Sequence, residues 1–332
     1  MAGTITMAEA VTIADVCPSV SVVIPLYNAG RDLPDLLHCL RNQTYPSDRV
    51  QYLLVDNNSQ DNTATLLAQA VPTLPGLQPL TEAEIQSSYA ARNRGIHSAT
   101  GDLILFTDGD CRPQPQWLER MVQPFADPAV GLVVGQLTAL PGSHWLERYA
   151  KHRELMDQRY TLAHPLGAYG QTANLGVRRS ALGLSGLFRP YLTTGGDADL
   201  CWRLQRSAPW TVAFAETAIV QHRHRSTWSG LMEQWHRYGT SNGYLHHLHG
   251  AKRQSPPSAR RIFYILGRWL LKEVGLGVGS VVLGQKDWVQ LVATPIDLWC
   301  DYVRYRGQQR SQLPAAAHTI EPYTPPTDLR PT

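Results

Sequence analysis

The chain has 332 residues, of which 43% are hydrophobic and 17% are charged. This composition is typical of a globular protein, and the length suffices for one large domain or two smaller ones. The formal net charge of +3 is too small to indicate a nucleic-acid partner. The five cysteines include no Cys-x-x-Cys pair and are odd in number, which favours reduced thiols in the cytoplasm over a disulfide framework. The N-terminus lacks a basic segment followed by a long apolar one, so we expect no signal peptide.

The first third of the chain alternates between strand and helix patterns. Residues 1–17 carry no periodic pattern, and we expect them to be a loose lead-in. After them, runs of β-branched and apolar residues predict buried strands, and apolar residues at helical spacing predict helices. The predicted strands cover 19–25, 52–55 and 103–106, and the predicted helices cover 33–40, 63–70 and 88–100. Strands and helices that alternate at this length predict a parallel sheet with right-handed crossovers.

Two of the predicted strands end in aspartates. The strand Leu103–Phe106 leads into Asp108-Gly109-Asp110, and the strand before it ends at Asp56. Because ligands of open α/β sheets bind at the carboxyl ends of the strands, these carboxylates would face a ligand. Neighbouring carboxylates repel each other, and a divalent cation with oxygen ligands removes that conflict. The same residues also suit a turn or a helix cap, so both interpretations stay open at this point.

The middle of the chain adds further candidate groups. Asp197 follows two glycines at the expected start of a helix, where the helix dipole favours the carboxylate form. His222 and His224 alternate on an extended segment and point the same way, as metal ligands would, although such pairs are also common at surfaces. The remaining predicted elements are helices over 117–125 and 145–160, a strand over 130–135 and a strand-like segment over 170–179.

Taken together in chain order, these motifs resemble glycosyltransferase family 2, whose members use nucleotide-sugar donors. The resemblance covers roughly residues 18–240 and implies an α/β GT-A fold with a mostly parallel central sheet, followed by a helical C-terminal region. It departs from the family at Gly196, where a glutamate usually precedes the aspartate. The matching segments are Val22–Asn28, Leu54–Ser59, Ala91–Gly95, Phe106–Asp110, Ala173–Asn174, Val177–Arg179 and Gly196–Leu200.

The resemblance also implies a role for each matching residue. Asp197 corresponds to the catalytic base, and Asp110 to a ligand of the Mn²⁺ or Mg²⁺ ion that bridges the donor diphosphate. Asp108 would contact the ribose or the metal, and His222, with His224 as the alternative, would lie beside the metal. Gln234, Arg237 and Tyr238 resemble a Gln-x-x-Arg-Trp element of polysaccharide synthases that binds acceptor or diphosphate. The implied donor-binding residues are Pro25, Tyr27, Asn28, Asp56, Arg92, Asp108 and Asn174.

The resemblance therefore predicts an inverting, hexosyltransferase-like enzyme that moves a sugar from a nucleotide-diphosphate donor, with UDP-sugars favoured, to an acceptor hydroxyl. A metal stabilises the leaving diphosphate, and a carboxylate accepts the hydroxyl proton. The expected acceptor is a glycan or a lipid-linked molecule, in the synthesis of polysaccharide, glycolipid or cell-surface glycan. The alternative is a catalytically silent nucleotide-sugar-binding protein, for which Gly196 is the only hint.

The C-terminal part, predicted as a helical region over residues 241–305, contains a conspicuous apolar segment from Ile262 to Leu283. Its uncharged part is shorter than the about 20 residues of a membrane span, which disfavours a processive membrane synthase. The segment is either a soluble helical subdomain or a patch that docks on an anionic membrane, since basic and aromatic residues accompany it. We thus expect a protein of the cytoplasm or of the cytoplasmic face of the membrane. Residues 306–332 are expected to be a disordered tail.

Overall fold

The computed structural model describes residues 17–256 and 258–324, so residues 1–16 of the predicted lead-in lie outside the described part. The strands are β1 (Val20–Leu26), β2 (Val50–Asp56), β3 (Leu77–Thr81), β4 (Leu103–Phe106), β5 (Cys111–Pro113), β6 (Val130–Ala139), β7 (Leu175–Arg178) and β8 (Thr211–His222). The α-helices are α1 (Leu33–Arg41), α2 (Thr63–Ala70), α3 (Ser88–His97), α4 (Trp117–Val122), α5 (Trp145–His152), α6 (Arg159–Leu162), α7 (Leu182–Ser185), α8 (Gly196–Ser207), α9 (Trp228–His249), α10 (Ala259–Arg268), α11 (Gly275–Val282) and α12 (Val289–Arg310).

The strands form one eight-stranded sheet in the order β3-β2-β1-β4-β7-β6-β8-β5. The first four strands pair in parallel, as the strand–helix alternation predicts. In the second half β7 runs antiparallel to both of its neighbours, while β6 and β8 are parallel. The predicted α/β architecture is confirmed, with a sheet that is mixed because β7 and β5 reverse direction.

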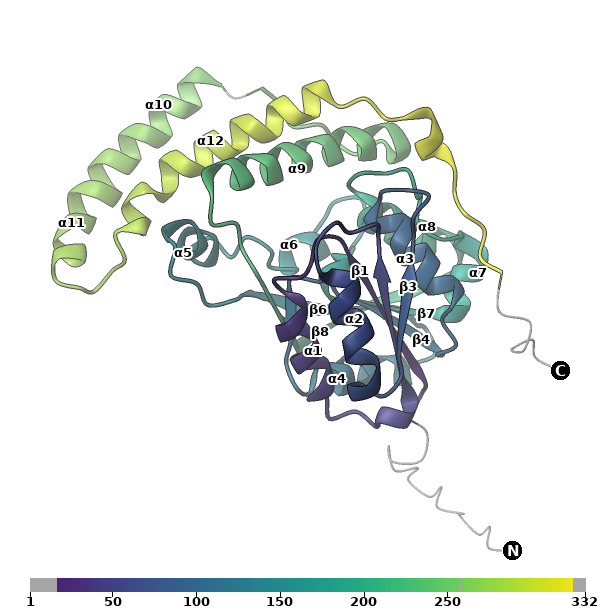
Figure 1. The fold of residues 1–332 in the computed structure, drawn as a ribbon. Coiled ribbons are helices and arrows are strands. Elements are labelled where there is room, and N and C mark those ends of the chain that lie inside the picture. The colour runs from purple at the N-terminus through teal and green to yellow at the C-terminus, as the bar shows by residue number, and fades with distance from the viewer. Residues whose placement is uncertain (1–16, 257, 325–332) are drawn as a thin grey trace, which may run out of the picture.

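Helices cover both faces of this sheet (Figure 1). Alternate residues of β1 point to opposite faces, so that Val22 and Ile24 pack with α1, α2 and α4 whereas Val23 packs with α3, α7 and α8. Two apolar clusters result, one on each side of the sheet. Burial on both faces explains why β1, β2 and β4 are continuous apolar runs in the sequence.

The segment from residue 145 to 160 differs from its prediction as a single helix. It forms α5 and the short α6, and the residues between them make a loop. Glu154 in this loop has a φ of 49°, a left-handed conformation that ends helical hydrogen bonding. Similarly, only Leu175–Arg178 of the strand-like segment 170–179 is a strand, because Thr172–Asn174 forms a 3₁₀ turn, η5.

The helix α9 lies above the sheet beside α12, and the two run in the same direction (Figure 1). Glycines allow their backbones to touch. A Cβ atom at Gly239 would lie 1.9 Å from the carbonyl oxygen of Arg304, and one at Gly307 would lie 2.2 Å from that of His236. The domain boundary predicted between residues 240 and 241 is therefore wrong, since it cuts the middle of α9 and separates two helices that pack as a unit.

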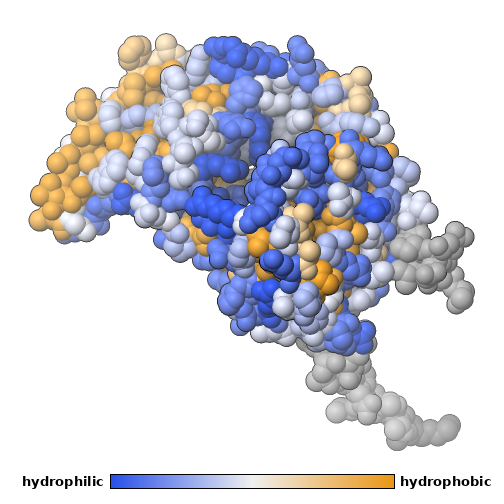
Figure 2. All heavy atoms as spheres, in the orientation of Figure 1, coloured by the Kyte–Doolittle hydropathy of each residue, from blue (hydrophilic) through white to orange (hydrophobic). Residues whose placement is uncertain are grey.

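The helices α10 and α11 form, with the π-helical turn η7 (Trp269–Val274) between them, an arm that projects from the body (Figure 1). The helix α10 and the turn η7 bury no side chain, and α11 buries only Gly277. Figure 2 shows this arm as a largely apolar surface. Within residues 17–256 and 258–324, no helix combines the length and the hydropathy needed to cross a membrane.

The prediction of a disordered tail from residue 306 is wrong for the part that the structure describes. Residues 306–310 form the last turn of α12, and the following chain packs along α3 and α7. The Glu321 carboxylate accepts hydrogen bonds from Asn93 and pairs with His97, both at 2.7 Å, and Ala317 is fully buried. These contacts fix a proline-rich segment that has no periodic pattern of its own. Residues 325–332 lie outside the described part.

Candidate active site

A cleft of about 1000 Å³ opens at the carboxyl ends of β1 and β4, beneath α9 and α12. Its size is in the range of small-molecule sites, and its position is the one that open α/β sheets use for ligands. Most of the predicted site residues line this cleft, and they come from distant parts of the sequence. These are Pro25, Tyr27, Asn28, Arg92, Asp108, Asp110, Asp197, His222, Gln234, Arg237 and Tyr238.

Asp108 lies on the floor of the cleft and is held by Arg92. The Arg92 guanidinium donates to Asp108 Oδ1 at 2.5 Å, and its side chain is only 4% exposed. The rings of Tyr89 and Phe188 lie 5.6 and 6.0 Å from this guanidinium, within cation–π distance. A lone arginine on a helix is usually a surface residue. Here Arg92 on α3 is buried instead, and its positive charge compensates the Asp108 carboxylate in the cleft.

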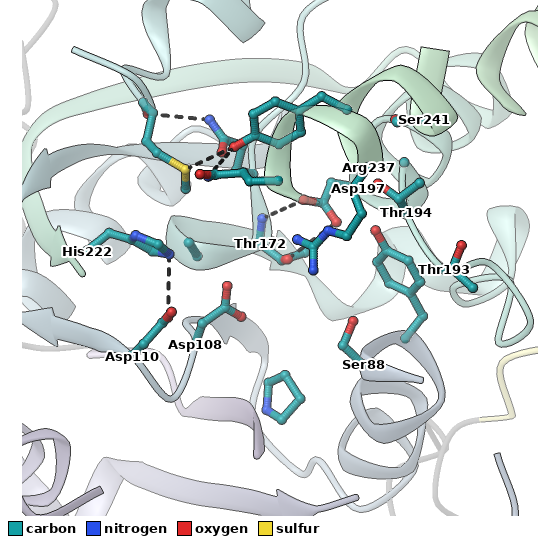
Figure 3. Close-up of a pocket in the computed structure, with 18 of the residues that line it drawn as sticks. Ser88, Asp108, Asp110, Thr172, Thr193, Thr194, Asp197, His222, Arg237 and Ser241 are labelled. Atoms are coloured by element: carbon teal, nitrogen blue, oxygen red, sulfur yellow. Dashed lines mark hydrogen bonds and ion pairs between the residues drawn. The ribbon is translucent and has the colours of Figure 1, made fainter. Parts of the chain in front are cut away.

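Asp110 and His222 form the candidate metal centre. Their facing atoms, Asp110 Oδ1 and His222 Nε2, are 3.4 Å apart (Figure 3). They meet because Cys111 and His222 are paired residues of the antiparallel strands β5 and β8. Among the described residues, the ligand atoms of Asp110, Cys111 and His222 all lie within 4.8 Å of one another. A carboxylate and an imidazole suit Mn²⁺ or Mg²⁺ together with phosphate oxygens.

Cys111 does not fit this metal centre as a ligand. Burial, followed by the charges of Asp110 and Asp108, raises the pKa of its thiol well above the ordinary value. A thiol is also a soft ligand, whereas Mn²⁺ and Mg²⁺ prefer oxygen ligands. His222 is the better candidate of the two predicted histidines, because it lines the cleft and presents its Nε2 atom to Asp110. Burial lowers the pKa of His224 to about 4, and this residue is not among the described residues that line the cleft; its ring centre lies 5.9 Å from that of His222.

Asp197 occupies the opposite side of the cleft, in the first turn of α8 (Figure 3). Its two carboxylate oxygens accept hydrogen bonds from the amide and the hydroxyl of Thr172, at 3.2 and 3.3 Å. Burial raises the pKa of this carboxyl, although the charge of Arg92 and the Thr172 amide act in the opposite direction. The start of α8 favours the carboxylate form, as the sequence indicates, but desolvation has the larger effect on the pKa of this carboxyl.

Asp199, two residues further on, turns away from the cleft into the protein. It is fully buried and forms ion pairs with Arg189, Arg203 and His249 at 2.9 to 3.0 Å. Burial alone would raise the pKa of this carboxyl, but the hydrogen bond from His249 and the arginine charges lower it to about 2. Asp199 is thus a structural anion that ties α8 to α9.

The glycines before Asp197 serve close packing rather than flexibility. Gly195 has a φ of 80° and starts α8 from a left-handed conformation. A Cβ atom at Gly196 would lie 2.7 Å from the Tyr89 ring, and the Gly196 amide donates to the Tyr89 hydroxyl at 2.9 Å. Tyr89 therefore occupies the space that a glutamate side chain at position 196 would need. This aromatic residue carried no recognisable signal in the sequence.

Two residues that were expected to bind the donor do not line the cleft. Asn174 is fully buried, and its amide group bonds to Trp117, Gln136 and Ala218 at 2.8 to 2.9 Å. The structure therefore does not bring Asn174, which was predicted to bind the donor, to the cleft, because these internal partners use its side chain. Asp56 is also buried and accepts a hydrogen bond from the Ser59 amide, whereas its neighbour Asn57 lines the cleft.

The predicted Gln234-x-x-Arg237-Tyr238 element lies on α9 and faces the cleft. Gln234 donates to the Tyr238 hydroxyl at 2.8 Å, which fixes both side chains, while the exposed Arg237 points into the open space near Asp197 (Figure 3). Three further polar groups of this wall were not expected from the sequence, namely Thr172, Tyr169 and Arg304. Arg304 comes from α12, far beyond the segments that carried the resemblance.

Comparison with known proteins identifies the family of the chain. Residues 21–183 match the model of Glycosyl transferase family 2, and residues 103–301 match that of Glycosyl transferase family group 2. The chain is 36% identical to the glycosyltransferase AglE of Haloferax volcanii over 66% of its own length and 71% of that protein. It is 30% identical to the pre-mycofactocin glycosyltransferase of Mycobacterium tuberculosis over 79% of its own length, but it spans only about half, 54%, of that protein.

Two solved structures show the same fold. The mannosyltransferase PcManGT from Pyrobaculum calidifontis, in complex with GDP-Man and Mn²⁺, aligns with a TM-score of 0.58 over 89% of this chain and 88% of its own, at 18% identity. Glucosyl-3-phosphoglycerate synthase from Mycobacterium tuberculosis, in complex with Mn²⁺, UDP-glucose and phosphoglyceric acid, aligns with a TM-score of 0.51 over 71% and 81%, at 18% identity. The chain belongs to glycosyl transferase family 2 and is a glycosyltransferase with the GT-A fold.

Proposed function

We propose that this glycosyltransferase is a metal-assisted, inverting enzyme that transfers a sugar from a nucleoside-diphosphate donor to an acceptor hydroxyl. The observation that carries this proposal is the arrangement of one cleft, with Asp110 and His222 on one side and Asp197 on the other. The Mn²⁺ in the complexes of the two structural neighbours supports the choice of a divalent ion. When bound, such an ion would supply charge stabilisation for the leaving diphosphate.

On the donor side, the residues at the strand ends bind and orient the nucleotide. Pro25 near the end of β1 forms the rim together with Tyr27 and Asn28, which follow this strand, and Asn57 directly after β2 lies near the nucleobase. Arg92 holds Asp108 in place for the ribose or the diphosphate. UDP-sugars are the favoured donors, and GDP-mannose in the structural neighbour supports testing guanine nucleotides as well.

On the acceptor side, Asp197 accepts the proton of the attacking hydroxyl. Both of its oxygens are oriented by Thr172, so one face of the carboxylate is directed at the cleft. Burial raises the pKa of this carboxyl, which makes it a stronger base than an exposed carboxylate. Displacement in one step by the activated hydroxyl inverts the anomeric carbon. The acceptor is a glycan or a lipid-linked molecule, and the product belongs to a polysaccharide, glycolipid or cell-surface glycan.

The experiment that tests this function combines binding and turnover. UDP- and GDP-sugars are screened for thermal stabilisation of the protein with Mn²⁺, with Mg²⁺ and with excess chelator, and donor hydrolysis is measured for those that bind. We expect Mn²⁺-dependent stabilisation and hydrolysis, both of which Asp110→Asn abolishes. Turnover that persists in chelator would refute the metal role, and binding without any hydrolysis or transfer would favour the silent nucleotide-sugar-binding protein.

We further propose that the arm of α10, η7 and α11 docks the enzyme on an anionic membrane surface, such as the cytoplasmic leaflet. Its apolar side chains are exposed to an extent that is rare on monomeric proteins, with Leu271, Leu276 and Val282 between 75% and 79% exposed. The exposed cations Arg260, Arg261, Arg268, Lys272 and Lys286 accompany them, and none of these pairs with a carboxylate in the described residues. Helices that bind at a membrane interface combine apolar side chains, which insert into the membrane, with cations that attract anionic lipids.

A further inference from the structure

The wall of the cleft opposite the strand ends contains an arginine from the last long helix. Arg304 lies on α12, and the close contact of Gly239 and Gly307 with the facing backbones holds α12 against α9. The backbone at Arg304 can move away from the Gln234–Tyr238 element only if this contact between α9 and α12 breaks. The arginine is therefore a fixed part of the cleft rather than a side chain of a peripheral helix.

The Arg304 guanidinium is only partly satisfied within the protein. Its Nη2 atom donates to Asn242 Oδ1 at 3.2 Å, and its buried Nε atom has no hydrogen-bond partner within residues 17–256 and 258–324. Among the described residues no carboxylate oxygen lies within 4.0 Å of it. A buried, charged donor without a partner is costly, so a ligand that accepts its hydrogen bonds would bind favourably.

The position of Arg304 assigns it to the acceptor half of the cleft. Asn242, which accepts its hydrogen bond, lines the cleft together with its neighbour Ser241. A Cβ atom at Gly195 would lie 2.7 Å from Ser241 Oγ, so this part of α9 lies against the start of α8, which carries the proposed base. Asp197, Arg237 and Ser241 of this half lie across the cleft from Asp108, Asp110 and His222 (Figure 3). A group bound by Arg304 would therefore lie on the side of the cleft that carries Asp197, rather than on the side of Asp110 and His222.

We infer that Arg304, oriented by Asn242, binds an anionic group of the acceptor, a phosphate or a carboxylate, while the acceptor hydroxyl reaches Asp197. This inference rests on the proposed function and adds the chemical class of the acceptor to it. A guanidinium offers paired donors that match both anions. Arg225 also lines the cleft, and it remains available to the donor diphosphate.

The test uses the full chain saturated with Mn²⁺ and the nucleoside diphosphate, UDP or GDP, that stabilises it more. Because the donor diphosphate site is then filled, any further anion reports on the acceptor half. Hexyl phosphate and hexanoate are titrated by calorimetry, with hexanol as the neutral control. We expect one of the two anions to bind and hexanol to bind far more weakly. Arg304→Gln should weaken binding of that anion about tenfold or more, the size of a charge-assisted hydrogen bond.

Arg306→Gln is the matched control, because Arg306 lies on the same helix, donates to Tyr302 and does not line the cleft. It should leave anion binding unchanged, and both variants should bind the nucleotide with Mn²⁺ as the wild type does. If Arg304→Gln does not fold, Arg304→Lys replaces it, with an affinity expected between wild type and no binding.

Three results would overturn the inference. In the first, neither anion binds to the wild type. In the second, Arg304→Gln and Arg306→Gln lose the same anion affinity. In the third, Arg304→Gln loses nucleotide affinity together with anion affinity, which would assign this arginine to the donor diphosphate. A failure of the proposed function looks different, since it appears as Mn²⁺-independent nucleotide binding that Asp110→Asn does not change.

Discussion

The two walls of the cleft are built in different ways. The donor wall consists of residues that directly follow strands, such as Tyr27 after β1 and Asp108 after β4. The acceptor wall is assembled from helices and turns that are distant in the sequence, from Tyr89 to Arg304. The residue that follows a strand is placed by the position of that strand in the sheet. A residue on a helix, in contrast, reaches the cleft only through tertiary packing of the helix. The comparison predicts that substitutions in the donor wall mainly affect metal and nucleotide, and those in the acceptor wall affect turnover and packing.

The largest expected effect is that of Asp197→Asn, which probes the acceptor wall. Asparagine keeps the shape of the side chain but removes the basic lone pair, so transfer should fall by roughly 10²-fold or more, as for the loss of a general base. Nucleotide affinity with Mn²⁺ should change little, because Asp197 lies across the cleft from Asp110. Steady-state kinetics and calorimetry on the same preparation measure both quantities. Normal turnover of this variant would show that another group takes the proton.

Asp199→Asn provides the structural counterpart two residues away. This substitution leaves Arg189 and Arg203 without their buried anion, and the loss of one partner of a buried ion pair costs about 3–5 kcal/mol of unfolding free energy. Denaturant unfolding measures it. In the wild type the pKa of this carboxyl is about 2, below its unfolded value of about 3.9. The stabilisation is therefore present at neutral pH and is lost as the pH falls from about 4 towards 2. A variant as stable as the wild type at pH 7 would contradict this role.

Gly196→Ala tests the packing of Tyr89 in the acceptor wall. The added methyl group would lie 2.7 Å from the Tyr89 ring, so the ring has to move and its hydrogen bond to the Gly196 amide is strained. Overpacking of this kind costs about 1–3 kcal/mol. Gly267→Ala in α10 is the matched control, because a Cβ there meets no atom within 4 Å and alanine favours the helix. Thermal unfolding should show a loss for the first and no loss for the second. If Gly196→Ala and Gly267→Ala changed the thermal stability equally, the steric explanation for glycine at position 196 would be wrong.

The same contrast explains what the sequence could predict. The parallel half of the sheet and the positions of Asp108 and Asp110 follow from apolar runs with polar residues at their ends, and both aspartates line the cleft. His222, which also lines it, was indicated by the family resemblance. The internal bonding of Asn174 was not predictable, because its partners Trp117, Gln136 and Ala218 come from three separate segments. Arg304 and the packed chain from residue 311 to 324 were missed for the same reason. Their positions depend on glycine contacts and on Glu321, which leave no periodic signal.

The smallest effect on the catalytic domain is expected from changes in the arm, which lies apart from both walls. Leu271→Glu combined with Leu276→Glu places two charges on its most exposed apolar surface. Burial of one leucine contributes about 1.5–3 kcal/mol, so binding to phosphatidylglycerol vesicles should weaken at least about tenfold. The melting temperature and donor hydrolysis should change little, because Leu271 and Leu276 are 75% and 76% exposed and lie outside the cleft.

Leu184→Glu is the matched control for this double variant, since Leu184 is 72% exposed on α7 of the catalytic domain. It should leave vesicle binding intact. Wild-type binding should also decrease as the salt concentration rises, because cations of the arm contribute to it and salt screens them. If the double variant and the Leu184 variant sediment equally with vesicles, the membrane does not cover the arm. If the wild type instead dimerises in solution and the double variant does not, a second copy of the chain covers this surface, and the enzyme meets its acceptor without a membrane.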